Sequence, residues 1–302
     1  MTNTYPLSDA SAATAGDIED TLERGGVVWF EHCPIALPDT DDLEFLRSGI
    51  GVGMKAKNLS YHPESDSIPR FDAPPEIRER AERILRAHGQ RVAEFWSERL
   101  PDFMPGAELG TTSFRPVEER GRDLKPRSSN ELVHIDAGAY GATNGARILR
   151  FFVNVNPTRE RIWGTMGSFS ELMDRTPALW EAARGSAERV RIRKGLADRA
   201  YSGAIRAAQS VYPLFRVIDS SPYDRSMRRI HNRMKEDPAI RDDREYYREI
   251  HFPPWSAWMV FTDGISHSVL EGQHAFITTA LIPLENCRRY EQTPHGILGA
   301  GT

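Results

Sequence analysis

The chain has 302 residues and a mass of 34.1 kDa, which is typical of one large domain or two small ones. Hydrophobic residues make up 39% of the chain and aromatic residues 9%, so the composition predicts a folded globular protein and excludes a disordered one. The net charge of -4 and the pI near 6.2 argue against nucleic acid as a ligand.

The cysteines and the N-terminal sequence indicate a cytoplasmic protein. Cys33 and Cys287 are too few for a disulfide framework or a thiolate zinc site, and buried free thiols suit a reducing compartment. Residues 1–16 are small and polar, do not resemble a signal peptide, and are expected to be disordered. No apolar run reaches the roughly 18–20 residues of a membrane span. We expect residues 17–302 to form one domain, with any membrane contact peripheral.

Helical and strand patterns are unevenly distributed along the chain. Helical spacing of apolar residues is found, in chain order, over residues 17–24, 75–100, 169–199, 223–235 and 242–249. Strand patterns bounded by turn residues are found over 27–31, 132–136, 147–155, 255–262 and 275–282. This order predicts a mainly β protein with helical additions, a double-sheet jelly roll whose first and last strands pair. The helices of about 169–250 then form an insert, because strands lie on both sides of them.

The strongest chemical signal starts at the tripeptide His134-Ile135-Asp136. Residues i and i+2 of a strand point to the same face, so the His134 imidazole and the Asp136 carboxylate project into one space. These are two of the three ligands in the two-histidine-one-carboxylate triad that holds non-haem Fe(II). The spacing alone is common by chance, and a hydrogen-bonded core histidine is the alternative interpretation of His134.

A third ligand is expected from a late strand, since a jelly roll brings its first and last strands together. The aromatic strand 255–262 is followed by a glycine turn and then by His267, which is the preferred third ligand. His274 is the competitor, although its place after a glycine is more typical of a loop. His231 and His251 lie among charged residues in helical surroundings, where solvated or salt-bridging roles are expected.

Strand 147–155 carries an arginine and an asparagine on one face. The alternate positions are apolar, namely Leu149, Phe151, Val153 and Val155. Burying an unpaired charge is costly, so Arg150 needs a partner, and a bound carboxylate suits its guanidinium fork. In an iron oxygenase that partner is the distal carboxylate of 2-oxoglutarate, with Asn154 on the same face and Arg147 as the alternative anchor. The other interpretations are a protein acid as the partner, or a solvent-exposed face.

Basic residues gather ahead of the proposed metal motif. They are Lys55, Lys57, Arg115, Arg122, Lys125 and Arg127. Such a run is more often a solvated surface, and the alternative is a pocket for an acidic substrate that carries carboxylate or phosphate. We identify Lys57, Arg115 and Arg127, together with Tyr61, as the candidate substrate-binding residues.

Taken together, these stretches resemble the Kdo hydroxylase family, also called Kdo 3-hydroxylases. The matching segments are KNLSYHP (57–63), TSFRPVEERGRDL (112–124), NELVHIDA (130–137), GARILRFFVNVNPTRERIW (145–163), PYDRSMRRIHNRMK (222–235) and FPPWSAWMVFTDGISHSVLEGQ (252–273). They follow the family's order over nearly the whole chain. No single segment is diagnostic, but six in register make coincidence implausible.

The resemblance implies an Fe(II)- and 2-oxoglutarate-dependent dioxygenase with a double-stranded β-helix fold. The family hydroxylates C3 of 3-deoxy-D-manno-oct-2-ulosonic acid (Kdo) in the inner core of lipopolysaccharide, giving the sugar Ko. The implied acceptor is therefore Kdo-lipid A, met at the inner face of the inner membrane. His134, Asp136 and His267 fall on the family's iron triad, and no catalytic residue beyond these ligands is implied.

One loop departs from the family pattern. Residues 138–141 read GAYG, where an aromatic residue and prolines are expected. Because this loop flanks the iron ligands, the alternative function is a dioxygenase of the same class that acts on another acceptor, such as a small natural-product intermediate or a protein side chain. A non-oxidative cupin-type isomerase or binding module is a more distant alternative.

Overall fold

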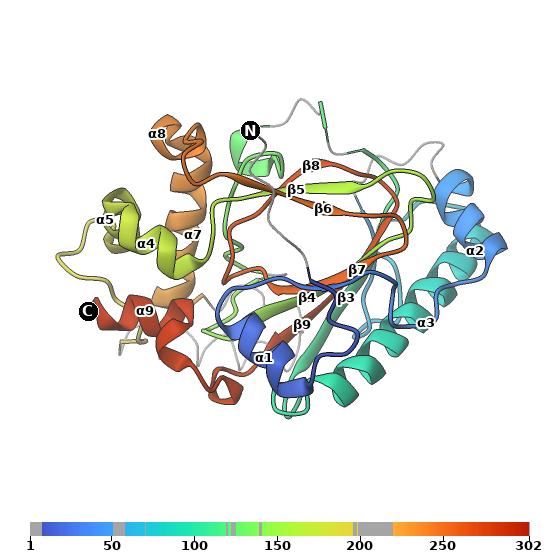
Figure 1. The fold of residues 1–302 in the computed structure, drawn as a ribbon, viewed down its shortest axis with the longest axis horizontal. Coiled ribbons are helices and arrows are strands. Elements are labelled where there is room, and N and C mark those ends of the chain that lie inside the picture. Colours follow the sequence, from blue (N-terminus) through green and yellow to red (C-terminus); the bar gives the residue numbers. More distant parts are fainter. Residues whose placement is uncertain are drawn as a thin grey trace.

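Two antiparallel sheets face each other in the computed structural model, with helices at one end and beneath the larger sheet (Figure 1). The structure describes residues 8–50, 58–69, 71–118, 120–121, 125–138, 141–195, 198 and 220–301. Among these residues, no helix is long and apolar enough to cross a membrane.

The larger sheet has six strands in the order β1-β7-β4-β9-β3-β2. Their bounds are β1 Val28–Phe30, β2 Leu59–Tyr61, β3 Glu108–Arg115, β4 Arg147–Asn154, β7 Ala257–Phe261 and β9 Ala275–Ile282. Every neighbouring pair is antiparallel. The early strands β1 and β3 pair with the late strands β7 and β9, which confirms the predicted pairing of the chain's first and last strands.

The smaller sheet has three strands in the order β6-β5-β8. Their bounds are β5 Arg161–Thr165, β6 Arg248–Phe252 and β8 Ser268–Glu271. The sheet is antiparallel and lies across the roll from β4 and β7 (Figure 1). Two facing antiparallel sheets with helical additions confirm the predicted double-stranded β-helix of the jelly-roll type.

The helices stand outside the roll. Their bounds are α1 Ala15–Glu23, α2 Thr40–Glu44, α3 Pro75–Arg99, α4 Phe169–Arg175, α5 Pro177–Arg184, α7 Pro222–Glu236, α8 Pro238–Arg241 and α9 Pro294–Ala300. Short π- or 3-10 turns lie at η1 Phe45–Gly49, η2 Pro126–Ser128, η4 Leu284–Asn286 and η5 Tyr290–Gln292. α3 starts with Pro75, whose missing N–H costs nothing in a first helical turn, as its sequence predicts.

The two faces of β4 belong to different cores. Leu149, Phe151 and Val153 point outward, into an apolar core shared with α3. Phe152 points inward, toward aromatic residues of the other strands, and this inner cluster contains Trp163, Phe252 and Trp258. The rings of Phe252 and Trp258 stack with centroids 3.7 Å apart. The aromatic cluster therefore fills part of the interior of the roll.

Along the chain, β5 is followed by the helices α4, α5, α7 and α8 and then by β6. The strands β5 and β6 are paired in the smaller sheet. The helices have an apolar core of their own, which includes Leu172, Leu179, Met227 and Ile230. The chain enters and leaves this helical region through paired strands. The division of the chain into a disordered start and a single domain with an insert stays a prediction.

Two expected helices differ in the structure. The helical pattern predicted over 169–199 breaks at Thr176, because Pro177 begins a new helix and cannot donate a backbone N–H to the preceding turn. That second helix ends at Arg184, residues 185–195 are turns, bends and irregular chain, and most of 196–199 lies outside the described residues. The helix predicted over 242–249 is wrong: a turn, bends and irregular chain occupy 242–247, and β6 begins at Arg248. Pairing with β5 and burial of Ile250 and Phe252 outweigh local helical spacing there.

The start of the described chain lies along β1. The Ala10 N–H donates to the Trp29 carbonyl at 2.7 Å, and Asp9 forms an isolated bridge with Trp29. Thr14 then caps α1 by accepting the Asp17 N–H.

Candidate metal centre

The side chains of residues 133–136 alternate between the roll and the core of the helical region. His134 and Asp136 point toward the roll, whereas Val133 and Ile135 pack into the helical core. An antiparallel bridge to His267 holds the segment, through His134 N–H to His267 O at 3.0 Å and the reverse bond at 2.8 Å. The Asp136 N–H donates to a further carbonyl, that of Thr262 at 3.0 Å. The strand predicted over 132–136 is thus reduced to one bridge, but the predicted facing is confirmed.

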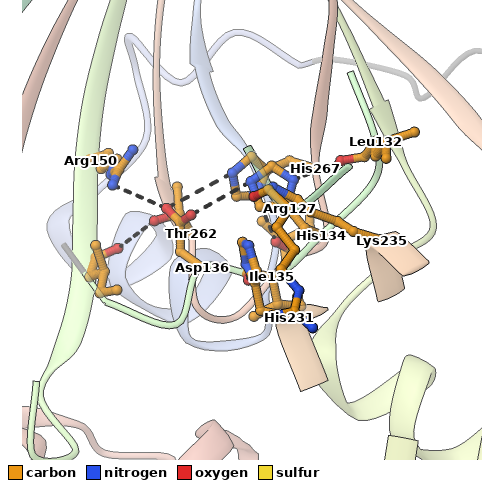
Figure 2. A network of polar contacts seen from close by, with 12 residues as sticks. Arg127, Leu132, His134, Ile135, Asp136, Arg150, His231, Lys235, Thr262 and His267 are labelled. Atoms are coloured by element: carbon orange, nitrogen blue, oxygen red, sulfur yellow. Dashed lines mark hydrogen bonds and ion pairs between the residues drawn. The ribbon is translucent and has the colours of Figure 1, made fainter. Parts of the chain in front are cut away.

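His134, Asp136 and His267 meet in one place (Figure 2). One ligand atom from each lies within 4.8 Å of the others. His134 Nε2 is 3.7 Å from Asp136 Oδ1, and His267 Nε2 is 4.0 Å from Asp136 Oδ2. The structure therefore brings the three predicted metal ligands together.

The other ring nitrogens of both histidines face backbone carbonyls. His134 Nδ1 is 2.8 Å from Leu132 O, and His267 Nδ1 is 3.2 Å from Ile265 O. A carbonyl can only accept, so each Nδ1 carries the proton and each Nε2 presents a lone pair toward Asp136. Metal-binding histidines commonly donate their other ring N–H to a backbone carbonyl in this way.

The protonation states also suit a metal. Burial lowers the pKa of His134 well below its usual value, with a further lowering by the neighbouring His267. Burial also lowers the pKa of His267. Burial alone would raise the pKa of Asp136, but Arg150 and the two histidines hold it below its usual value. At neutral pH the site presents two neutral imidazoles and one carboxylate, which is the ligating form of all three groups. These residues fit a divalent ion such as Fe(II).

Arg150 comes from the inner face of β4. Its Nη2 lies 3.1 Å from Asp136 Oδ2, and its side chain is 21% exposed. Its Nε is buried and makes no hydrogen bond to any described residue. Thr279 stands opposite it on β9 and is also buried. A cation with an unused donor therefore lies beside the candidate metal ligands.

The other two residues predicted on this strand have different surroundings. Arg147 projects from the opposite face to Arg150 and is buried, with Nε 2.6 Å from Asp263 Oδ2. Asn154 Nδ2 donates to three backbone carbonyls, those of Arg159 before β5 and of Phe252 and Pro253 before β7. Arg147 is thus ion-paired with Asp263, although its two Nη atoms are buried and make no hydrogen bond to a described residue, and neither residue is a member of the triad.

The predicted substrate-binding residues have four different settings. Lys57 lies outside the described residues. Tyr61 faces α3 on the outer side of the sheet, where its hydroxyl donates to Asp66. Arg115 is buried on β3, with Nε donating to Asn58 Oδ1 at 3.1 Å. Arg127 is exposed beside the metal-bearing segment and pairs with Glu236.

The remaining histidines divide clearly. His274 does not join the triad and stacks against Phe114, with centroids 6.2 Å apart. His251 pairs with Glu160 at 2.8 Å, the salt-bridging role expected of it, although on a strand. His231 is different, because its Nδ1 lies 2.7 Å from Ile135 O, between two metal ligands. The solvated or salt-bridging role predicted for His231 is therefore wrong. This contact was not predicted from the sequence, where the only signal was a histidine four residues before a lysine on an amphipathic helix.

Two histidines and one carboxylate gathered inside a double-stranded β-helix are the ligand set of non-haem Fe(II) oxygenases. The chain matches, over residues 8–300, the sequence profile of the family described as 3-deoxy-D-manno-oct-2-ulosonic acid (Kdo) hydroxylase. It therefore belongs to the Kdo hydroxylase family, as the sequence resemblance indicated.

Solved structures show the same fold. The apo structure of the Kdo hydroxylase KdoO, a non-heme Fe(II) alphaketoglutarate-dependent dioxygenase, superposes with a TM-score of 0.75 at 24% identity, covering 99% of this chain and 94% of that one. The same coverage and TM-score are found for KdoO in complex with alphaketoglutarate and Fe(III), at 23% identity. KdoO with succinate and Fe(III) gives a TM-score of 0.74 at 24% identity and the same coverage. No curated protein sequence gave a significant match.

Proposed function

We propose that this protein is an Fe(II)- and 2-oxoglutarate-dependent dioxygenase that hydroxylates C3 of Kdo in Kdo-lipid A, giving Ko. The observation that carries the proposal is the convergence of His134, Asp136 and His267 in a chain of the Kdo hydroxylase family. The complexes of KdoO with alphaketoglutarate and with succinate support the choice of cosubstrate and of coproduct.

His134, Asp136 and His267 would hold the Fe(II). When bound, Fe(II) would supply the oxidation in which 2-oxoglutarate and O₂ become succinate and CO₂ and the second oxygen atom enters a C–H bond of the sugar. The protein binds the reactants, aims the sugar carbon and excludes side reactions.

Arg150 is the proposed anchor for the distal carboxylate of 2-oxoglutarate. It lies on the inner face, beside Asp136, and its Nε has a donor to spare within the described chain. The planar guanidinium matches a carboxylate in two-point geometry. The Thr279 hydroxyl across the sheet is a further donor for the same group.

The aromatic cluster closes the interior on one side of the metal centre. Trp163 stacks on His267, with ring centroids 5.2 Å apart, and packs edge to face on Trp258. These rings exclude water and keep the His267 imidazole in one orientation. We therefore place the acceptor on the side of the triad that the cluster does not fill.

The acceptor is anionic, and the basic residues Lys57, Arg115 and Arg127 are the proposed partners of its carboxylate and phosphates. Because lipid A resides in a bilayer, we place the enzyme in the cytoplasm with peripheral contact at the inner face of the inner membrane. Charge reversal at Arg127 is expected to raise the KM for the acceptor without changing the KM for 2-oxoglutarate.

The test is mass spectrometry of Kdo₂-lipid A after aerobic incubation with the protein, Fe(II) and 2-oxoglutarate, with succinate measured in parallel. A gain of one oxygen that needs all three additions supports the proposal. Succinate without oxidised lipid would mean that the acceptor is wrong. Neither product, from protein shown to hold iron, would overturn the oxidative function.

A further inference from the structure

The segment 133–136, which carries two of the metal ligands, packs against the helix α7 through the segment's apolar side chains. Val133 and Ile135 are buried in the same core as Met227, Ile230 and Met234. These three residues recur at helical spacing on one stripe of α7. Val133 and Ile135, which alternate with the two ligands, thus pack on the helical region and not on a sheet.

A polar contact reinforces this seating. His231 Nδ1 lies 2.7 Å from the Ile135 carbonyl oxygen, and its ring stands edge-on to that of His134, with centroids 5.0 Å apart (Figure 2). One turn later on α7, Lys235 Nζ donates to the Arg127 carbonyl at 3.3 Å. The helix therefore contacts the chain both before and within the segment that carries two metal ligands.

The segment needs this support because the sheet gives it little. It forms one isolated bridge with His267, whereas β4 has a continuous ladder on both sides. The Ile135 carbonyl belongs to the peptide that links Ile135 to Asp136. Fixing that peptide plane fixes the direction in which the Asp136 carboxylate leaves the chain.

We propose that His231 is a positioning residue of the metal centre, which locks the peptide between the ligands His134 and Asp136 by donating its Nδ1–H to the Ile135 carbonyl. This inference rests on the metal-binding part of the proposed function. It assigns to α7 a role in metal affinity, in addition to covering the roll. His231 is not one of the three candidate ligands, so its effect on the metal would be carried through the peptide between two of them.

The experiment compares two nearly isosteric variants of the full chain, His231→Leu and His231→Asn. The amide nitrogen of asparagine replaces Nδ1 and keeps the donor, whereas leucine removes it. We measure the Kd for Co(II) anaerobically on chelator-stripped protein, from the visible absorption bands of the bound ion. His231→Leu is expected to weaken binding about 10–100-fold, the usual cost of losing a residue that orients the metal ligands, and His231→Asn to stay within about threefold of the unaltered protein.

A third variant guards against a general loss of folding. His231→Gln is polar and of similar size, but its donor lies near the Nε2 position, so it is expected to bind Co(II) nearly as weakly as the leucine variant. His251→Leu, on β6, is the control for loss of a histidine away from the triad. Equal Co(II) affinity in the leucine, glutamine and asparagine variants, or no Co(II) binding by the unaltered protein, would overturn the proposal.

No acceptor and no turnover enter this measurement. A protein that binds Co(II) with the expected ranking but leaves Kdo unoxidised would contradict the proposed substrate and leave the role of His231 standing. The reverse result, normal hydroxylation by all His231 variants with unaltered Co(II) affinity, would contradict only the positioning role.

Discussion

Arg147 and Arg150 lie on opposite faces of the same strand, β4, and their surroundings differ. Arg147 is buried on the outer side, paired with Asp263, and its guanidinium lies 4.1 Å from the centroid of the Phe261 ring. Arg150 is partly exposed on the inner side, and its carboxylate neighbour, Asp136, is itself a candidate metal ligand. The two arginines therefore differ in the acid that they face: Arg147 pairs with an acid outside the triad, whereas Arg150 pairs with a member of it and is partly open to solvent.

The difference extends to the two faces of the larger sheet. The outer face packs on α3 through an apolar core, and the buried charge of Arg147 is paired there with Asp263. The inner face carries Arg150 and the hydroxyl of Thr279 and lies beside the triad, with Arg150 Nη2 3.1 Å from Asp136 Oδ2. Changes on the outer face should therefore act on stability, and changes on the inner face on metal and cosubstrate binding.

The largest expected effect is the loss of hydroxylation and of metal binding when a metal ligand is removed. His267→Ala is expected to abolish hydroxylation and to weaken Co(II) binding by more than the roughly 10–100-fold that a supporting residue costs. His274→Ala, seven residues later and outside the triad, is the matched control and should retain both. If His274→Ala lost the metal and His267→Ala kept it, the triad would be wrongly assigned.

Breaking the pair on the outer face should cost stability. Arg147→Met leaves Asp263 buried without its cation, which is expected to lower the free energy of unfolding by about 3–5 kcal/mol. Urea denaturation of the apo protein measures it. The KM for 2-oxoglutarate, taken at a temperature where the variant is folded, should be unchanged. A raised KM with unchanged stability would make Arg147 the anchor instead.

An arginine-to-methionine substitution on the inner face should raise the KM for 2-oxoglutarate instead of lowering stability. Arg150→Met is expected to raise the KM for 2-oxoglutarate about 30-fold or more, as for truncation of a buried charge pair worth roughly 2 kcal/mol or more. Co(II) affinity should change by no more than a few-fold, and Arg150→Lys should recover only part of the loss, because an ammonium cannot make the two-point contact. An unchanged KM would remove Arg150 from the cosubstrate site.

Alternation along a strand is local, and this is why much of the site could be predicted from the sequence. The i and i+2 spacing of His134 and Asp136 sets their common face, and the glycine turn after an aromatic strand pointed to His267. Both follow from backbone geometry that every strand shares. The family, the fold and the class of enzyme were predicted on the same segments and are confirmed by the family match.

The features that could not be predicted from the sequence depend on contacts between residues far apart in the chain. The segment 242–249 has helical spacing, but β6 starts within it because β5 offers a ladder. Tyr61 faces α3, because its register with β3 places it opposite Thr112 on the outer side. The contact of His231 with Ile135 joins residues 96 positions apart, and no local pattern encodes it.

The outer face also contains a titratable group that must stay neutral. His88 on α3 is fully buried, stacks on Phe276 with centroids 4.2 Å apart, and neither ring nitrogen has a hydrogen-bond partner among the described residues. Burial lowers the pKa of His88 to about 3. Below about pH 6.5 the His88 side chain is protonated in the unfolded chain but stays neutral in the folded protein. The free energy of unfolding therefore decreases as the pH falls from 6.5 toward 3.

Replacement of His88 by a ring that does not titrate should remove this cost. Between pH 7 and pH 5 the unaltered apo protein is expected to lose about 2 kcal/mol more stability than His88→Phe, at 1.36 kcal/mol per pH unit below the unfolded pKa. Urea denaturation of both proteins at the two pH values measures the difference, in which the acid sensitivity of the triad histidines cancels. Equal losses would mean that His88 is protonated inside the fold. The outer face would then tolerate an unpaired charge, and its contrast with the inner face would fail.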